Sequence, residues 1–247
     1  MFKYGKLPVK EDSRTLCFSK YNAKLPPPPP QNDSSLYVFQ DKLKVDPCNA
    51  MTYFPMDGND HYGCCTCAAA YHLITLWEGI VGNRVVASAQ DVVKTYQTLT
   101  GGPDTGLTCL DVLNYWKNTG IGDNKILAYV KVDHTNHTEI KQAISLFGAV
   151  YLGFDVQQNA QEDFNTQMPW KAGPKTGDGH CVVIVAYSPD YVRCLTWGNS
   201  QLGEWGWVDG NVVEAYAIIP QEANALHFAL GFDIETLQAD LQAIAEA

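Results

Sequence analysis

The sequence predicts an α+β protein in which helices come first and antiparallel strands follow. Two observations lead to this prediction. Up to about residue 120, apolar residues recur at helical spacing, and beyond it they alternate or run together as they do in strands. Short turn sequences separate these later segments, which favours antiparallel pairing of neighbours. The chain has 247 residues, 46% of them hydrophobic, which is enough for a large packed core and excludes wholesale disorder.

Three helices are expected in the first half of the globular part. The first has its apolar residues on one face of a helix. Ser88 and Thr108 indicate the starts of the next two helices. Asp91 lies three residues after Ser88, and Asp111 lies three residues after Thr108. A hydroxyl and an acid at this spacing are typical of a capped helix start. The expected helices cover residues 66–81, 88–101 and 108–120.

The second half is expected to be mostly strands, with one helix between the first two. Asn136, followed by Glu139, is expected to cap that helix, and Gly148 to end it. The apolar run 181–187 suits a strand that is covered on both faces. The expected strands cover residues 125–132, 149–154, 181–187, 191–197 and 214–219.

The two ends of the chain differ from this globular pattern. Residues 1–45 are expected to form an extended arm, in which Pro26–Pro30 adopt a polyproline II rod. The rod either lies on the surface as a strap or binds an aromatic groove of a protein partner. Residues 231–247 are expected to form a C-terminal helix that Asp233 caps.

Charge and hydropathy exclude several classes of partner. The net charge is −10, and no basic patch stands out, so nucleic acid is not an expected partner. The sequence contains no run of 18 apolar residues, which is the length that a membrane-spanning helix requires. The N-terminus lacks the apolar stretch of a secretory signal, which predicts a cytoplasmic location.

The segment 57–69 is the strongest candidate for chemistry. A loop with two glycines, Gly58 and Gly63, leads directly into an expected helix start at Cys65. The positive end of a helix dipole lowers the pKa of a thiol and favours the thiolate. Far downstream, His180 begins the apolar strand 181–187. A thiol beside a histidine forms a nucleophile for acyl transfer.

The order of these segments resembles the papain-like cysteine peptidases. Gly63, Cys65 and Ala68 match the G-x-C-x-x-A motif that opens the family's long helix, and His180 lies where the catalytic-histidine strand begins. The likeness covers about residues 50–220, and the segment before Cys65 is also similar to uncharacterised phage-encoded proteins. It implies a papain-like domain over residues 46–230, with a helical subdomain, an antiparallel β subdomain and a cleft between them.

The resemblance implies a role for three residues. Cys65 is the nucleophile, His180 is the general base and acid, and Asn59 stands six residues before the nucleophile, where the family's oxyanion-hole carboxamide lies. The family usually has glutamine at this position. The backbone N–H of Cys65 is the second oxyanion donor. Thr66 stands where the family has a tryptophan.

The residue that orients the histidine is less clear. The family uses an asparagine, and Thr196-Trp197-Gly198 stands near its place, so that Thr196, Trp197 and Asn199 are the candidate orienting or cleft residues. Cys65 and His180 are 115 residues apart, fewer than the roughly 130–150 that are usual in the family.

The expected function is a papain-like thiol hydrolase or acyltransferase that acts through a Cys–His dyad on a peptide or a small amide or ester. The alternative is a non-catalytic structural or assembly protein, of the virion type, on the same scaffold, because a fold does not establish an activity. For this structural or assembly protein, the expected location is the virion instead of the cytoplasm.

Some alternatives concern single residues. Cys64 is the nucleophile if the match to the family motif is displaced by one residue. His180 could be a purely structural histidine. His61 with Cys64, Cys65 and Cys67 could bind zinc, but zinc sites draw on two separated ligand pairs and the sequence offers no second pair. We therefore expect neither a metal nor a cofactor.

Overall fold

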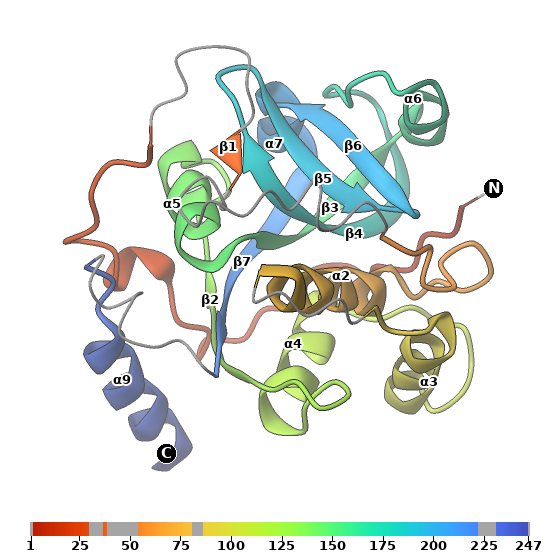
Figure 1. The fold of residues 1–247 in the computed structure, drawn as a ribbon. Coiled ribbons are helices and arrows are strands. Elements are labelled where there is room, and N and C mark those ends of the chain that lie inside the picture. The colour runs from red at the N-terminus through yellow and green to blue at the C-terminus, as the bar shows by residue number, and fades with distance from the viewer. Residues whose placement is uncertain (1, 30–36, 39–53, 81–85, 222–230, 247) are drawn as a thin grey trace.

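A computed structural model describes residues 2–29, 37–38, 54–80, 86–221 and 231–246. Its centre is a seven-stranded antiparallel sheet in the order β2-β7-β3-β4-β5-β6, with β1 paired to β4 (Figure 1). The strands are β1 (Tyr37–Val38), β2 (Ile126–Lys131), β3 (Val150–Gln157), β4 (Lys175–Tyr187), β5 (Tyr191–Thr196), β6 (Asn199–Glu204) and β7 (Val212–Pro220). The helices are η1 (Phe18–Lys20), α2 (Cys65–Ile80), α3 (Ala89–Thr100), α4 (Cys109–Asn118), α5 (His137–Phe147), α6 (Ala160–Thr166), α7 (Trp205–Asn211) and α9 (Ile234–Glu246).

The sheet separates two hydrophobic cores. Side chains alternate along β4, so that Cys181 and Val183 pack with helices α2, α3 and α4, whereas Val182 and Ile184 face the opposite side. The core on this opposite side, called the second core below, also contains residues of α5, α6 and α7. Helix α2 runs along one face of the sheet, with α3 and α4 beyond it (Figure 1). The predicted α+β class, with a helical part followed by an antiparallel β part, is confirmed.

The helix boundaries follow from local capping. Ser88 and Thr108 each form a full capping box with the aspartate three residues later, as predicted. Helix α3 ends where Gly101 adopts a left-handed conformation with φ of 73°. The polar strand β6 and the short helices α6 and α7 are additional to the predicted elements, and β4 begins six residues before its predicted start.

Part of the predicted arm lies in the second core. The side chain of Phe18 is completely buried and contacts Phe232, with ring centroids 5.6 Å apart. The first prolines lie along the domain, where the carbonyls of Pro26 and Pro29 accept hydrogen bonds from Gln142 and Tyr187. Pro30, Val81 and the predicted domain boundaries at residues 45 and 230 lie outside the described residues.

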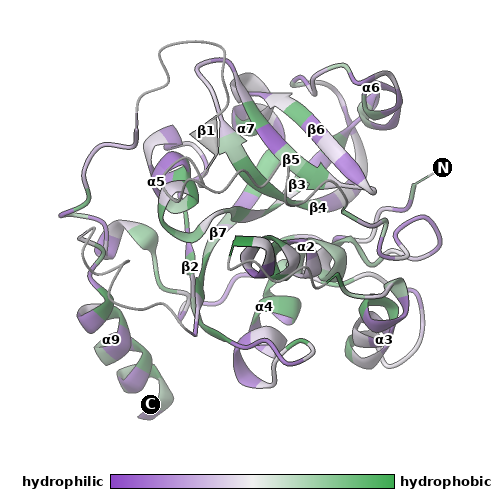
Figure 2. Cartoon of the chain, viewed as in Figure 1, coloured by the Kyte–Doolittle hydropathy of each residue, from purple (hydrophilic) through white to green (hydrophobic). Residues whose placement is uncertain are grey.

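Hydropathy follows this architecture. Apolar residues are concentrated along the central strands, while α9 alternates between hydrophobic and hydrophilic residues (Figure 2). Leu237 of α9 is completely buried against the second core. Among the described residues, no helix is both long enough and apolar enough to cross a bilayer.

The buried position of Phe18 predicts that the N-terminal segment contributes to stability. Phe18→Ala leaves a cavity beside Phe232, which costs about 3–5 kcal/mol of unfolding free energy for a phenylalanine in a core. Met168→Ala is the control, because that side chain is 54% exposed, and we expect a change within about 0.5 kcal/mol. Urea denaturation of both variants measures the difference. Equal, small losses would show that residues 16–22 are a dispensable arm.

Candidate active site

Cys65 is the first residue of α2, and a tight loop sets its position. Asp57 and Gly58 both have positive φ values, 56° and 76°, which turn the chain sharply. The side-chain amide of Asn59 donates a hydrogen bond of 3.0 Å to the carbonyl of Tyr62 and closes the loop. The chain then enters the helix at Cys65, which is only 1% exposed.

A buried contact between Asp57 and His72 joins this loop to the helix. The carboxylate of Asp57 lies 3.2 Å from Nε2 of His72, and both side chains are at most 2% exposed. The same ring nitrogen is 3.0 Å from the carbonyl oxygen of Pro55. His72 therefore has a structural role, which is to fix the loop before Cys65 against the second turn of α2.

His180 lies on β4 in an aromatic environment. Its ring stacks on Trp197, with centroids 4.5 Å apart, and contacts the edges of Phe154 and Tyr4. Nε2 lies 2.8 Å from the hydroxyl of Thr196. Nδ1 is buried, and the described residues offer it no hydrogen-bond partner. A buried nitrogen without a partner is costly, so this atom is a candidate for function.

The turn between β5 and β6 holds Trp197 over the histidine. Thr196 pairs with Asn199, so only Trp197 and Gly198 form the turn. Both have positive φ, 48° and 76°, as a two-residue hairpin turn of this type requires. Such a backbone conformation is strained for a bulky residue such as tryptophan. This strained turn holds the ring of Trp197 over the ring of His180.

Cys65 lies close to β4, the strand that carries His180. Helix α2 packs on β4, and the thiol of Cys65 faces the backbone N–H of Cys181, the residue that follows His180. A second backbone N–H, that of Gly5, also faces the thiol. The fold therefore brings the beginning of α2 to the strand that carries His180. The described residues show no hydrogen bond between the two side chains.

Burial decides the ionisation of both groups. Burial raises the pKa of the Cys65 thiol to about 12, although the N–H groups of Cys181 and Gly5 act in the opposite direction. Burial also lowers the pKa of His180 to about 3, and the nearby His72 adds to this shift. At neutral pH the thiol therefore keeps its proton and the imidazole is neutral.

The predicted lowering of the Cys65 pKa is wrong for this conformation. The thiol does lie at a helix start, as predicted, but desolvation outweighs the dipole of α2. Helix-terminus effects on a charge amount to about 0.3–2 kcal/mol, whereas full burial can shift a pKa by several units.

The other candidate residues have defined partners. Asn199 is exposed, and its side-chain oxygen accepts a hydrogen bond from the N–H of Ser200. Thr196, not Asn199, therefore contacts the ring of His180. Asn59 lies in the loop before Cys65, and its carboxamide is bound to the Tyr62 carbonyl.

The neighbouring cysteines are buried in the core on the helical side of the sheet. The thiol of Cys64 points to the carbonyl of Asp57, at 3.4 Å, and Cys67 is completely buried. Burial raises the pKa of both thiols. Among the described residues, no group of three or more His, Cys, Asp or Glu side chains is arranged to hold a metal ion.

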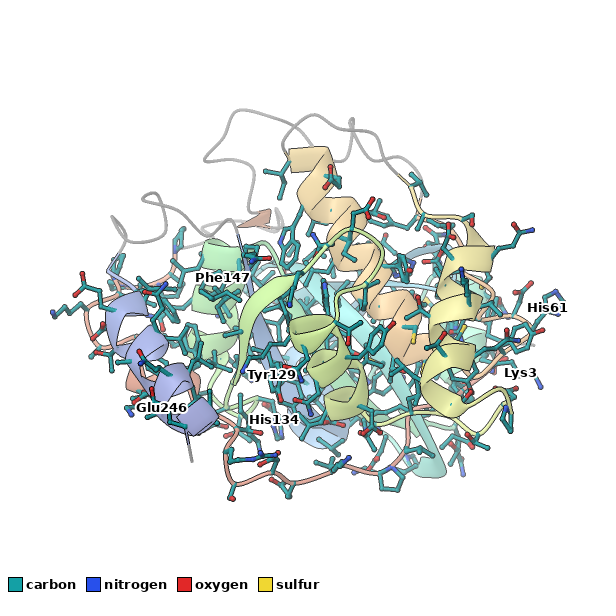
Figure 3. The ribbon with its side chains drawn as sticks, turned by 90° about the horizontal axis from the view of Figure 1, so that it is seen from below. Lys3, His61, Tyr129, His134, Phe147 and Glu246 are labelled. Atoms are coloured by element: carbon teal, nitrogen blue, oxygen red, sulfur yellow. The ribbon has the colours of Figure 1, made fainter. Side chains whose placement is uncertain are left out.

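The segment 2–7 covers the candidate site, and sequence analysis did not find this. The backbone N–H of Lys3 donates to the carbonyl of Asn59, at 2.9 Å, and the ring of Tyr4 contacts His180. Seen from below, Lys3 and His61 lie at the same edge of the molecule (Figure 3). No helical or strand period marks this segment. The one available signal was Gly5 within an otherwise bulky run of residues.

Solved structures of cysteine proteases are similar to this fold. Xylellain, a cysteine protease from Xylella fastidiosa, matches with a TM-score of 0.60 over 88% of this chain and 96% of that chain, at 14% identity. The chain has the papain-like cysteine protease fold. Procathepsin B S9 from Trypanosoma congolense matches with a TM-score of 0.59, at 12% identity, over 89% of this chain and 87% of that chain.

A plant enzyme extends the comparison. The cysteine protease CMS1MS2 from Carica candamarcensis, in complex with E-64, matches with a TM-score of 0.52 and 16% identity, over 76% of this chain and 98% of that chain. At these identities the likeness establishes the papain-like fold alone. No protein-family model matches the sequence, and no curated protein is significantly similar to it.

The buried, neutral His180 predicts a specific pH dependence of stability. The unfolded chain binds a proton at this residue below its ordinary pKa of 6.5, but the folded chain does so only near pH 3. Between these values the unfolded state holds more protons, so stability falls as the pH falls. His180→Gln removes up to about 1.4 kcal/mol per pH unit from this slope. Urea denaturation between pH 6.5 and pH 4 measures it.

His61→Gln is the matched control, because the side chain of His61 is 78% exposed. We expect this variant to keep the wild-type slope. If His180→Gln also keeps it, the histidine is not held neutral in the folded protein.

Proposed function

We propose that this chain is a thiol hydrolase in which Cys65 attacks the carbonyl carbon of a peptide or ester and His180 transfers the proton. One observation carries the proposal. Nε2 of His180 is held by Thr196, and the buried Nδ1 lacks a partner. The next residue along the strand lies against the thiol of Cys65. An imidazole that is fixed at one nitrogen and open at the other is suited to general acid–base catalysis.

The proposed reaction has two steps. Nδ1 of His180 takes the proton of the Cys65 thiol, and the sulfur forms a bond to the substrate carbonyl carbon. The carbon–nitrogen or carbon–oxygen bond of the substrate then breaks, and the imidazolium returns its proton to the leaving group. Water then gives a proton to Nδ1 of His180 and attacks the thioester carbonyl carbon, the carbon–sulfur bond breaks to release the acid, and the imidazolium returns the proton to the sulfur of Cys65. The N–H of Cys65 and the second amide hydrogen of Asn59 are the proposed oxyanion donors.

Substrate access requires residues 2–7 to leave. Tyr4 and Gly5 cover the ring of His180 and the thiol of Cys65, and both groups are neutral while they are buried. Exposure to water would reverse much of this desolvation, and the start of α2 would then favour the thiolate. Whether water or another nucleophile takes the acyl group decides between hydrolysis and acyl transfer. Adding a primary amine and identifying the product distinguishes the two.

The second candidate function is a non-catalytic structural or assembly protein on this scaffold. The specific observation that favours it is the burial of Cys65 and His180, which are each 1% exposed. A thiol whose pKa is raised to about 12 is a poor nucleophile at neutral pH. If residues 2–7 never leave, the protein keeps the fold without the reaction.

Removing the thiol tests the first candidate directly. Gly5→Ala is expected to displace the covering segment, because the added methyl would lie 1.9 Å from the carbonyl oxygen of Gly63. In that background we expect hydrolysis of a mixture of fluorescence-quenched peptides. Cys65→Ser should lower the rate by about 10⁴-fold or more. Cys67→Ser, at a buried cysteine of the same helix, is the control and should keep it. Equal losses in both variants would contradict the assignment of Cys65.

Thr196 is proposed as a positioning residue for the imidazole. Thr196→Val keeps the shape but removes the hydroxyl that contacts Nε2. We expect kcat to fall about tenfold or more with little change in KM, because the acid–base step depends on the ring orientation. Thr196→Ser retains a hydroxyl and should restore kcat. A serine variant that is as slow as the valine variant would show that the hydroxyl has no such role.

A further inference from the structure

The segment 2–7 is bound as an extended peptide between the helical and β parts. The N–H of Lys6 donates to the carbonyl of Gly179 on β4, at 3.1 Å, and the N–H of Leu107 donates to the carbonyl of Gly5, at 2.9 Å. The N–H of Leu7 also donates to the carbonyl of Leu107, at 3.0 Å. Main-chain hydrogen bonds of this kind hold an extended peptide whatever its side chains, so specificity must come from side-chain pockets.

The side chain of Lys6 fills such a pocket, which we call the Lys6 pocket. Nζ of Lys6 lies 2.9 Å from Oε1 of Glu214 on β7, and the two side chains are 2% and 0% exposed. The other carboxylate oxygen of Glu214 accepts a hydrogen bond of 2.9 Å from the hydroxyl of Tyr216. The thiols of Cys109 and Cys181, 3.9 Å apart, also lie near the ammonium group. The pocket therefore presents one fully buried carboxylate to one basic side chain.

Two glycines make room for this side chain and its backbone. A Cβ on Gly153 of β3 would lie 2.0 Å from Cε and 2.6 Å from Cδ of Lys6. A Cβ on Gly179 would lie 2.4 Å from the Lys6 carbonyl oxygen. Glycine weakens the interior of a strand, and it often marks a site where a ligand or another backbone approaches closely. The wall of the Lys6 pocket is thus shaped to the aliphatic stem of a lysine.

The ion pair is better explained by recognition than by stability. Burying two charges costs about as much as their attraction returns, and well-packed apolar residues are often as stable. Burial alone lowers the pKa of Lys6, but Glu214, together with the nearby Cys109 and Cys181, more than compensates, and the net shift of the pKa is upward. The carboxylate therefore discriminates strongly, because any neutral side chain in the pocket would leave it buried without a partner.

We propose that the Lys6 pocket is a specificity site that binds a lysine side chain of an extended peptide substrate, that Glu214 determines this specificity, and that Lys6 is its internal occupant. This inference rests on the proposed hydrolase function, since it names the substrate class of the same site. A substrate peptide with a lysine at the matching position would replace residues 2–7 and make the same main-chain hydrogen bonds.

The test measures peptide binding without turnover. The full-length protein carries Cys65→Ser, so that no peptide is consumed, and Gly5→Ala, which displaces residues 2–7 from the site. Faster hydrogen exchange at the amides of Lys6 and Leu7 verifies the displacement. The probe is a fluorescent peptide with the sequence of residues 2–8, compared with two versions that carry norleucine in place of one lysine.

Norleucine at the position of Lys6 is expected to weaken binding at least tenfold, whereas norleucine at the position of the exposed Lys3 should leave it unchanged. Glu214→Gln should abolish the difference between lysine and norleucine at the Lys6 position. Glu204→Gln is the matched control, because that carboxylate is a partly exposed partner of Lys171, and it should keep the difference. Equal binding of the Lys6 and norleucine peptides, a difference that persists in Glu214→Gln, or no binding of any peptide would overturn the proposal.

Two features keep the result interpretable. Binding is read in a protein without the thiol, so an inactive enzyme that still discriminates lysine would contradict the proposed function and leave the Lys6 pocket intact. If Gly5→Ala prevents folding, Lys6→Glu displaces the segment instead, because it places a second carboxylate against Glu214. The same order of peptide affinities is expected in that background, and its absence would overturn the proposal.

Discussion

The packing of helix α2 against strand β4 is the contact on which the candidate site depends. Three consecutive alanines, Ala68 to Ala70, follow the start of the helix and are at most 4% exposed, so the helix backbone can approach the sheet closely. The hydroxyl of Tyr151 on β3 donates to the carbonyl of Thr66 and fixes the first turn. This approach places the thiol of Cys65 against the backbone beside His180. Cys65 belongs to the core on the helical side of the sheet, whereas the ring of His180 contacts Phe154 and Trp197 of the other core.

Cys65 and His180 are both buried, and this burial opposes their reactivity. Cys65 and His180 are the residues that we propose for catalysis, but both are desolvated and neutral while residues 2–7 cover them. The covering segment is held by main-chain hydrogen bonds to Asn59, Gly179 and Leu107, and by the buried pair of Lys6 and Glu214. These are polar contacts that a substrate peptide could also make. We therefore propose that another peptide of similar chemistry replaces the segment.

Local sequence signals predicted much of the fold, because they depend on few residues. The capping boxes at Ser88 and Thr108 and the apolar run of β4 act within one element. Strand β6 was missed because its sequence is polar, although its pairing with β5 sets the strained turn at Trp197. That turn brings Thr196 to the imidazole, which no spacing rule could have chosen over Asn199.

The ionisation of the site was beyond sequence reasoning, because it depends on tertiary burial. The start of a helix is visible in the sequence, but the desolvation of Cys65 arises partly from residues 2–7, which have no periodic pattern. Glu214 was a visible signal, since a carboxylate within the apolar strand 212–220 requires a partner. Only the fold identifies that partner as Lys6.

We expect Cys65 to become covalently acylated when residues 2–7 leave the site. The most direct measurement is mass spectrometry of the intact Gly5→Ala protein after brief exposure to a reactive peptide ester, followed by peptide mapping. One acyl adduct is expected, located on Cys65 as a thioester, and no adduct is expected when His180 is replaced by alanine. An unmodified protein, or adducts spread over several cysteines regardless of His180, would contradict it.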